Sequence, residues 1–295
     1  MDTLQQVQGK KAVVTGGAGF IGTHIVAALK ERGFTVEVFD NKTGGNILDE
    51  QSLAKAFAGA EYVFHVAAMP RVPYSIEHPV ETNEANITGT LKVLVVARDA
   101  GVKKVIYSAS SSAYGDTTVM PLVETMPTHP ISPYGLQKYV GELYCRLFSE
   151  VYGLPTVSLR YFNVYGPGAD PNGAYALVIA KFIAQRQRGE PMTITGDGSV
   201  TRDYTHVRDV VRANILAAES DMVGKGEVLN IGAGKNVSVN RIAELIGGPT
   251  VNIPARLEPH DTLADNSLAK KLLGWEPQVT LEEGIAELKK LSNLM

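Results

Sequence analysis

The fold is decided by the stretch Lys11-Ala12-Val13-Val14-Thr15-Gly16-Gly17-Ala18-Gly19-Phe20-Ile21-Gly22. A short apolar run leads into glycines at positions 16, 19 and 22, and helical periodicity then continues over residues 19–32. The first glycine permits a tight turn, the second lets the backbone approach a diphosphate, and the third allows close packing between helix and strand. The first turn of such a helix presents unpaired N–H groups to an anion. The stretch therefore predicts a strand, a turn and a helix that bind a dinucleotide.

An acidic residue ends the next apolar run, residues 35–40. Asp40 lies at about the distance from the glycines at which dinucleotide-binding folds place an acid. A carboxylate there accepts hydrogen bonds from both ribose hydroxyls and repels a 2′-phosphate, so it favours NAD over NADP. The nearby Lys42 weakens this preference slightly. A glycine-rich turn that binds nothing is the alternative, but strand, turn, helix and acid together favour NAD as the cofactor.

Apolar, strand-like runs alternate with helical stretches through the first half of the chain. Further strands are expected at 61–66, 102–108 and 156–160, with helices at about 80–100 and over Pro133–Tyr152. Apolar strands separated by helices imply a buried parallel sheet with helices on both faces. This pattern predicts an α/β fold, a doubly wound parallel sheet of the Rossmann type.

The character of the chain changes after Asn163, where Gly and Pro signal loops and shorter elements follow. We expect a dinucleotide-binding domain over residues 1–165, with a later contribution from about 190–220, and a smaller α/β C-terminal lobe over 166–295 that mainly binds the substrate. Helices in this half are expected near 176–188, 207–219, 240–246, 267–272 and 281–291.

The composition argues against several other classes of protein. The net charge is −3 and the sequence has no Lys/Arg stripe, so nucleic acid is not an expected partner. A single cysteine, Cys145, and six scattered histidines lack the spacing of a metal site, so no metal is expected. No apolar run reaches membrane-spanning length and no secretion signal is evident, so we expect a cytoplasmic protein that does not bind membranes.

Tyr134 and Lys138 lie four positions apart on a predicted helix, so a phenol and an ammonium share one face. An adjacent ammonium and a cationic nicotinamide both favour the phenolate, which lowers the tyrosine pKa from about 10 toward working pH. Such a pair alone is an ordinary surface feature. The cluster Ser108-Ala109-Ser110-Ser111-Ser112, however, ends a predicted strand, where active-site groups gather. A serine there can bond the substrate oxygen and pass a proton to or from Tyr134.

These motifs resemble the extended short-chain dehydrogenase/reductases, and among them the NAD-dependent epimerases and dehydratases that act on nucleotide sugars. The resemblance covers nearly the whole chain. The motifs that carry it are Gly16-x-x-Gly19-x-x-Gly22, His65-Val66-Ala67-Ala68, Ser108-Ala109-Ser110-Ser111-Ser112-Ala113-Tyr114-Gly115, Tyr134-x-x-x-Lys138, Arg160-Tyr161-Phe162-Asn163-Val164-Tyr165-Gly166 and Gly196-Asp197-Gly198-Ser199-Val200-Thr201-Arg202-Asp203-Tyr204.

The resemblance implies a role for each matching residue. The catalytic residues would be Ser110, Tyr134 and Lys138, with Tyr134 as acid/base and Lys138 bonded to the nicotinamide ribose. The NAD-binding residues would be Gly16, Gly19, Phe20, Ile21, Gly22, Asp40, Asn41, Asn46, Ile47, Ala67, Ala68, Asn86, Ser108, Tyr134, Lys138 and Tyr161. The substrate-binding residues would be Ser110, Ser111, Ser112, Asn163, Val178, Arg202, Arg256 and Thr262. Asn163 and Arg202 match diphosphate contacts, and Arg202 suits a bidentate phosphate clamp, although a surface salt bridge is its alternative.

The residues after Ser110 favour one reaction within the family. Related dehydratases and decarboxylases usually place an acid there, whereas this chain has Ser111 and Ser112. The expected activity is therefore a UDP-hexose 4-epimerase working through a 4-keto sugar. Thr262 matches a position where a large residue excludes N-acetylated sugars, and residues 172–176 look like the branch that accepts them, so UDP-GlcNAc and UDP-GalNAc are expected substrates too. Thr262 as a mere loop residue, another epimerase or reductase (UDP-glucuronate or dTDP-sugar) and a non-catalytic NAD-sensing module remain the alternatives.

Two further expectations concern the region after Asp40 and the assembly. Only five residues separate Asp40 from Asn46, whereas a parallel crossover needs about a dozen. The family's helix between strands two and three should be missing, its third strand vestigial, the adenine site more open and NAD more exchangeable. Helices 80–100 and Pro133–Tyr152 pair family members into a homodimer by a four-helix bundle. Val93, Leu94 and Ala97 would supply such a face or else cover the chain's own sheet.

Overall fold

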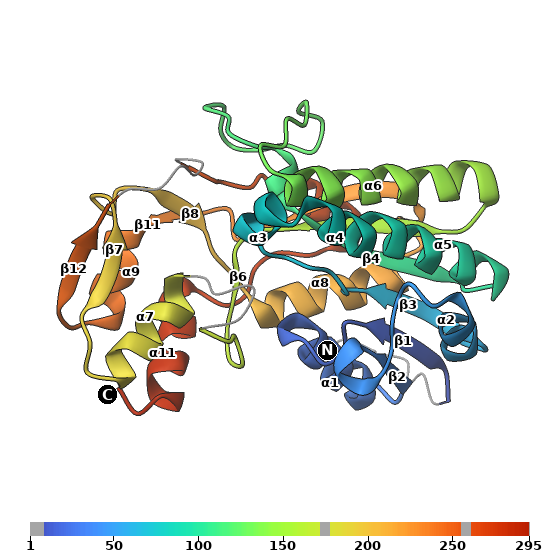
Figure 1. The fold of residues 1–295 in the computed structure, drawn as a ribbon, viewed down its shortest axis with the longest axis horizontal. Coiled ribbons are helices and arrows are strands. Elements are labelled where there is room, and N and C mark those ends of the chain that lie inside the picture. The colour runs from blue at the N-terminus through green and yellow to red at the C-terminus, as the bar shows by residue number, and fades with distance from the viewer. Residues whose placement is uncertain (1–8, 172–177, 255–260, 295) are drawn as a thin grey trace.

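Six parallel strands form the central sheet of the structure, a computed structural model that describes residues 9–171, 178–254 and 261–294. They are hydrogen-bonded in the order β10-β5-β4-β3-β1-β2 (Figure 1). Their bounds are β1 Lys11–Thr15, β2 Thr35–Phe39, β3 Ala60–His65, β4 Lys104–Ser110, β5 Thr156–Tyr161 and β10 Lys225–Ile231. The reversal of strand order beside β1 creates the crevice in which such sheets bind ligands.

Side chains that alternate along each strand enter two separate cores. Val14 and Ile106 belong to one core, and Val13 and Val105 belong to the other. The helices on the first face are α1 (Phe20–Glu31), α8 (Val207–Glu219) and α10 (Ser267–Leu273). Those on the opposite face are α2 (Glu50–Phe57), α5 (Gly89–Asp99) and α6 (Pro133–Tyr152) (Figure 1). The predicted doubly wound α/β fold is confirmed.

A smaller lobe lies beside the carboxyl ends of the strands, at the left of Figure 1. Its elements are α7 Val178–Gln187, β7 Met192–Thr195, β8 Thr201–Asp203, β11 Asn236–Ser238, α9 Val239–Ile246, β12 Thr250–Ile253 and α11 Leu281–Leu291. Strand β7 pairs with β12 and β8 pairs with β11, while Phe182, Ile194 and Ile242 fill the core of the lobe. The short strands β6 (Val164–Tyr165) and β9 (Thr205–His206) connect the lobe to the sheet.

The segment after Asp40 is as short as the sequence predicts. It contains only a 3₁₀ turn, η1 (Asn41–Thr43), and no strand at residues 46–48, so β2 forms the edge of the described sheet. Ile47 lies over Gly89, where a Cβ would come within 2.6 Å of its Cδ1. Lys92 donates a hydrogen bond to the carbonyl of Leu48 at 2.8 Å. The expected absence of a helix between Asp40 and Asn46 is confirmed, and the strand expected as vestigial at residues 46–48 is absent, so the chain reaches β3 through α2. Readier exchange of NAD stays a prediction.

The single helix expected over residues 80–100 is interrupted in its first half. Helix α3 (Val72–Glu77) precedes it, and α4 (Pro79–Asn83) then runs through a π-helical turn, η2 (Glu84–Thr88), into α5. The side chain of Asn86, within that turn, bonds the backbone of Met69, 17 positions earlier, through both its oxygen and its nitrogen. A π turn often marks a functional site because it re-aims one side chain. The helical periodicity of the sequence does not predict this π-helical turn.

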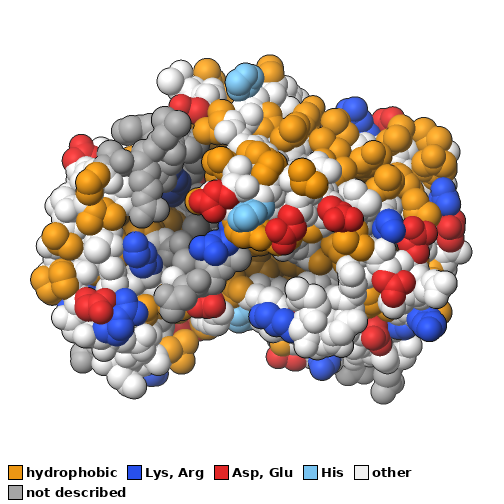
Figure 2. Space-filling view, in the orientation of Figure 1, with side chains coloured by type: hydrophobic (Ala, Val, Ile, Leu, Met, Phe, Trp, Pro, Cys, Tyr) orange, Lys and Arg blue, Asp and Glu red, His pale blue; other side chains and the backbone are white. Residues whose placement is uncertain are grey.

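The apolar residues expected on a dimer face prove to cover the chain's own sheet. Val93, Leu94 and Ala97 are completely buried beneath α5, so this alternative is the correct one. Exposed hydrophobic side chains instead follow one stripe of α6, at Leu136, Leu143, Leu147 and Val151. Figure 2 shows hydrophobic side chains gathered over the part of the surface that α6 occupies in Figure 1.

Candidate active site

The glycine turn is built as its sequence requires. Gly16 has φ +71°, in the left-handed region, and a Cβ on it would come within 2.6 Å of the backbone nitrogen of Ala67. A Cβ on Gly22 would lie 2.1 Å from the carbonyl oxygen of Gly16, so only glycine lets α1 approach the turn this closely. The N-cap of α1 is Gly19, which has no side chain to cap the helix. The first N–H groups of α1 are therefore suited to an anion.

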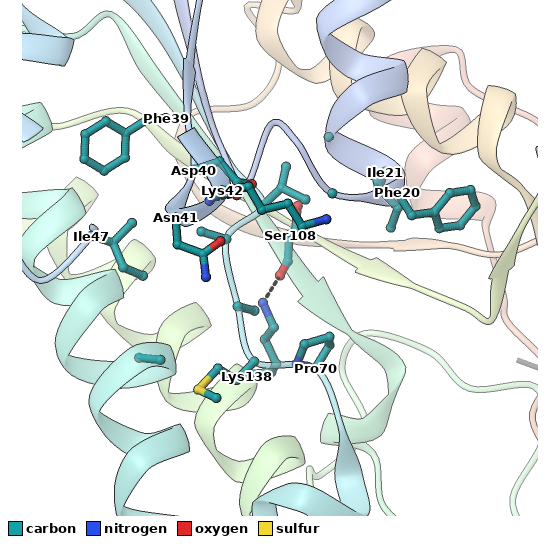
Figure 3. Close-up of a pocket in the computed structure, with 18 of the residues that line it drawn as sticks. Phe20, Ile21, Phe39, Asp40, Asn41, Lys42, Ile47, Pro70, Ser108 and Lys138 are labelled. Carbon is teal, nitrogen blue, oxygen red and sulfur yellow. Dashed lines mark hydrogen bonds between the residues drawn. The ribbon is translucent and has the colours of Figure 1, made fainter. Parts of the chain in front are cut away.

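A cavity of about 650 Å³ opens at the carboxyl ends of β1–β5 (Figure 3). Its wall contains all but one of the predicted NAD-binding residues, namely Gly16, Gly19, Phe20, Ile21, Gly22, Asp40, Asn41, Asn46, Ile47, Ala67, Ala68, Ser108, Tyr134, Lys138 and Tyr161. The catalytic candidate Ser110 lines it as well. Segments from Gly16 to Asp170, 154 positions apart in the sequence, thus share one surface. This volume suits a large, elongated ligand.

Asp40 joins the glycine turn to the turn after β2. Its carboxylate accepts hydrogen bonds from the backbone N–H of Lys42 at 2.9 Å and of Ala18 at 3.1 Å. Each carboxylate oxygen can accept more than one bond. The carboxylate therefore keeps acceptor capacity for a diol, and its negative charge lies at the wall of the cavity (Figure 3).

Asn86 is the predicted NAD-binding residue that the cavity wall does not include. It is buried, its amide oxygen accepts a hydrogen bond from the N–H of Met69 at 2.8 Å, and its amide nitrogen donates to Gln137 at 2.8 Å. The residue thus fixes the segment after β3, which carries Ala67 and Ala68 at the cavity wall. Its contribution to this surface is indirect.

The start of α6 positions the phenol and the ammonium. Ser132 caps the helix by accepting the N–H of Gly135, and Tyr134 follows, buried and at the cavity wall. One turn later, Lys138 Nζ donates a hydrogen bond of 2.7 Å to the carbonyl of Ser108 (Figure 3). Burial lowers the pKa of Lys138 to about 8, opposed by the negative charge of Glu142. The ammonium remains the main form at neutral pH.

The serine cluster forms a tight turn at the end of β4. Ser110 is the last residue of the strand and the N-cap of a 3₁₀ turn, η3 (Ser111–Ala113). Its Oγ accepts hydrogen bonds from the N–H of Ser112 at 3.2 Å and from the Oγ of Ser112 at 2.7 Å. Ser108 bonds Tyr161 instead, at 3.0 Å. Of Ser110, Ser111 and Ser112, only Ser110 lies at the cavity wall.

Two buried charged residues, Glu142 and Arg160, lie near Lys138, and the sequence motifs did not assign a role to either. Glu142 and Arg160 form a bidentate ion pair with distances of 2.9 and 2.6 Å, and both side chains are nearly inaccessible. The guanidinium also lies 4.5 Å from the ring centre of Tyr114. Because Glu142 follows Lys138 by four positions, the helical face that pairs Tyr134 with Lys138 predicts its location, although not its partner.

His65 is a further buried residue of the site. Its ring nitrogens bond the hydroxyls of Thr15 at 2.7 Å and of Thr90 at 2.9 Å, and its ring lies 5.6 Å from that of Tyr107. Burial, aided by the charge of Lys138, lowers the pKa of His65 to about 3. A neutral imidazole bonded to two hydroxyls is therefore part of the framework of the site, and it carries no positive charge at neutral pH.

The predicted substrate residues of the lobe meet around Asp203. Asn163, with φ +31°, donates through Nδ2 to the carbonyl of Asp203 at 2.9 Å and to Thr262 Oγ1 at 3.4 Å. Thr262 Oγ1 also accepts the N–H of Asp203 at 3.2 Å. The buried carboxylate of Asp203 accepts three backbone N–H groups, and burial raises its pKa to about 6. Arg202 adjoins this array, and its Nη1 donates to the carbonyl of Thr201.

The other predicted substrate residues lie elsewhere or outside the description. Val178 begins α7 in the lobe and packs against its core. Arg256 and residues 172–176 lie outside the described residues. Over the described ranges, no three His, Cys, Asp or Glu side chains are grouped as a metal site would require. No helix in the same ranges is long and apolar enough to span a membrane.

The sequence matches the model of the NAD dependent epimerase/dehydratase family over residues 12–232. The chain belongs to this family. The UDP-glucose 4-epimerase of Thermotoga maritima, solved with UDP-glucose, is 41% identical, with a TM-score of 0.90 over 96% of this chain and 99% of that one. The UDP-N-acetylglucosamine 4-epimerase of Methanobrevibacter ruminantium, solved with UDP-N-acetylmuramic acid, is 38% identical, with a TM-score of 0.90 over 98% and 100%. The NAD complex of Thermus thermophilus UDP-glucose 4-epimerase is 32% identical, with a TM-score of 0.87 over 96% and 99%.

The cavity of this NAD-dependent epimerase/dehydratase fits NAD on its own geometry. The side-chain-free helix N-terminus at Gly19 suits the diphosphate, and the carboxylate of Asp40 suits a ribose diol. Tyr134 and Lys138 lie at the same cavity wall, where the nicotinamide half would reach them. NAD, when bound, supplies the hydride acceptor and donor. The same cavity wall presents a phenol, an ammonium and a serine hydroxyl, those of Tyr134, Lys138 and Ser110.

Proposed function

We propose that this enzyme is a UDP-hexose 4-epimerase that works through a 4-keto sugar and accepts UDP-GlcNAc and UDP-GalNAc as well as UDP-Glc and UDP-Gal. The observation that carries the proposal is the joint presence of Ser110, Tyr134 and Lys138 on the wall of one NAD-sized cavity. Serines instead of acids follow Ser110, which supports inversion over elimination. The NAD would lie in the sheet domain and the sugar nucleotide mainly against the lobe.

The catalytic residues would divide the proton chemistry among them. Tyr134, as phenolate, takes the proton of the C4 hydroxyl and returns it after the keto sugar has turned over. Lys138 stabilises the phenolate by its charge and bonds the nicotinamide ribose. Ser110 hydrogen-bonds the C4 oxygen. The diphosphate would be held by Asn163, Arg202 and Arg256, so that the sugar turns without leaving.

A coupled measurement tests the proposed activity. The purified enzyme with NAD⁺ should convert UDP-GlcNAc to UDP-GalNAc, and chromatography of the sugar nucleotides detects the product. The absorbance of NADH should not rise during the reaction. The assay includes UDP-Glc, UDP-glucuronate and a dTDP-sugar as parallel substrates. Net NADH formation, or turnover of only the last two, would contradict the 4-epimerase proposed here. No turnover of any sugar nucleotide would favour a nucleotide-sensing module.

We predict that Thr262 sets the size of the accepted sugar. Thr262→Tyr should lower kcat/KM for UDP-GlcNAc by about 10²-fold relative to UDP-Glc, because an aromatic side chain fills the space of an N-acetyl group. The tyrosine also removes the hydroxyl that holds Asp203 and Asn163. Thr262→Val is the matched control, since it loses the hydroxyl at constant size. Equal loss for both sugars in Thr262→Tyr would show that Thr262 does not select the sugar.

We propose that two copies of the chain pair through α6. Four apolar side chains on one stripe of this helix are exposed, including Leu143 at 36% and Leu147 at 43%. Burying such a stripe against a second copy would remove it from water. Leu147→Glu should convert a dimer into a monomer in light scattering after gel filtration. Met222→Glu, at an exposed hydrophobic position outside α6, should leave the mass unchanged. A monomeric unmodified protein would refute the dimer.

A further inference from the structure

The hydroxyl of Ser110 has little free hydrogen-bonding capacity, because Ser112 bonds it twice. A serine hydroxyl offers one donor and two acceptor lone pairs. Ser110 Oγ accepts one bond from the N–H of Ser112 at 3.2 Å and a second from the Oγ of Ser112 at 2.7 Å. One neighbouring residue therefore occupies both lone pairs. The capacity that remains on Ser110 is its own O–H, at the wall of the cavity that Tyr134 shares.

Ser112 is itself held in place by the start of α6. Its carbonyl accepts the N–H of Gly115 at 3.3 Å. The same carbonyl lies so close to Gly135 that a Cβ there would come within 2.6 Å of it. Gly135 directly follows Tyr134, so Ser112 is packed against the helical turn that carries the phenol. The donor to Ser110 and the acid/base residue thus belong to one rigid unit.

We propose that Ser112 is a positioning residue that commits Ser110 to donate its proton to the C4 oxygen of the sugar, so that Tyr134 alone carries the reacting proton. The inference rests on the proposed function, because it assumes that Ser110 contacts C4. In the oxidation, the alcohol loses a hydride from C4 to NAD⁺ and its hydroxyl proton to the Tyr134 phenolate, which leaves the ketone. Ser110 keeps its proton and strengthens its bond as negative charge develops on the oxygen.

A proton relay through Ser110 would require different geometry. The hydroxyl would have to accept the sugar proton on a lone pair while it passes its own proton to Tyr134. Both lone pairs already accept from Ser112, so a relay would first have to break one of these bonds. A carboxylate at position 112 would reverse the bond, since it can only accept, and would take the Ser110 proton away from the substrate.

Kinetics of three variants test this role. Ser112→Ala should lower kcat about tenfold and leave KM within about twofold, because it loosens the donor without removing it. Ser112→Thr keeps a hydroxyl and should restore kcat. Ser112→Asp should lower kcat by more than Ser112→Ala does. In a Ser110→Ala background, Ser112→Ala should have no further effect on kcat, because the residue acts only through Ser110. NAD binding and the fluorescence of Trp275 confirm that each variant is folded.

Each of the other results would overturn the role. Equal kcat for Ser112→Ala and the unmodified enzyme would show that the bond does not matter. The same tenfold loss in both backgrounds, or a rise in KM, would make Ser112 an independent sugar contact. The failure of the proposed function is distinguishable from these outcomes. Ser110→Ala with undiminished turnover would remove Ser110 from catalysis, and an unmodified enzyme that turns over no sugar nucleotide would remove the reaction itself.

Discussion

Tyr134→Phe is expected to lower kcat by about 10²- to 10⁴-fold, the range that one positioned acid/base group contributes. The variant lacks the only atom of the side chain that can take a proton, while the ring still fills the same buried space at the cavity wall. NAD content after purification and the melting temperature should therefore stay close to those of the unmodified enzyme. Turnover is measured with UDP-Glc and UDP-GlcNAc.

Tyr144→Phe is the matched control on the same helix. Tyr144 is partly buried against the core of the sheet and does not line the cavity, so its hydroxyl should be dispensable for turnover. Undiminished kcat in Tyr134→Phe would remove the phenol from the reaction. A parallel loss in both variants would indicate damage to α6 as a whole.

The parts of the fold and site that the sequence predicts are those that depend on local pattern. The glycine turn, the start of α6 at Pro133 and the absence of a helix between Asp40 and Asn46 follow from spacing within a few residues. The Asp203 array depends on contacts between Asn163 and Thr262, 99 positions apart, which no local pattern reports. The role of Asn86 in the π turn likewise depends on its hydrogen bonds to the backbone of Met69, 17 positions earlier. Family resemblance named these residues, but only the fold shows that Asn86 acts from outside the cavity wall.

The ion pair between Glu142 and Arg160 affects the charge of Lys138, and the family motifs do not indicate it. A lysine beneath a cofactor must stay charged although burial lowers its pKa to about 8. Glu142, one helical turn away, raises that pKa through its negative charge. Such a carboxylate is itself costly to bury, and Arg160 compensates it with two hydrogen bonds of 2.9 and 2.6 Å. The ion pair thus holds a buried carboxylate near Lys138, and this carboxylate helps to keep the buried ammonium protonated.

Glu142→Gln should destabilise the protein by about 3–5 kcal/mol, because it leaves the Arg160 guanidinium buried without its counter-charge. Thermal unfolding followed by the fluorescence of the buried Trp275 measures this loss. In the pH profile of kcat, the alkaline limb, where kcat falls as pH rises, should also shift to lower pH in this variant. Without Glu142 the pKa of Lys138 falls further, so the ammonium that supports the Tyr134 phenolate loses its proton sooner as pH rises.

An exposed ion pair within α6 provides the control. Arg146 and Glu150 lie 3.9 Å apart with both side chains about 60% exposed, so Glu150→Gln should cost less than about 1 kcal/mol and leave the pH profile unchanged.

Replacing both Glu142 and Arg160 by Met should recover much of the stability that Glu142→Gln loses, since no charge then stays buried alone. It should not restore the alkaline limb, because Lys138 still lacks its carboxylate. Recovery of stability without recovery of the limb would separate the structural role of the pair from its electrostatic role. An unshifted limb in Glu142→Gln would show that Lys138 holds its proton without Glu142.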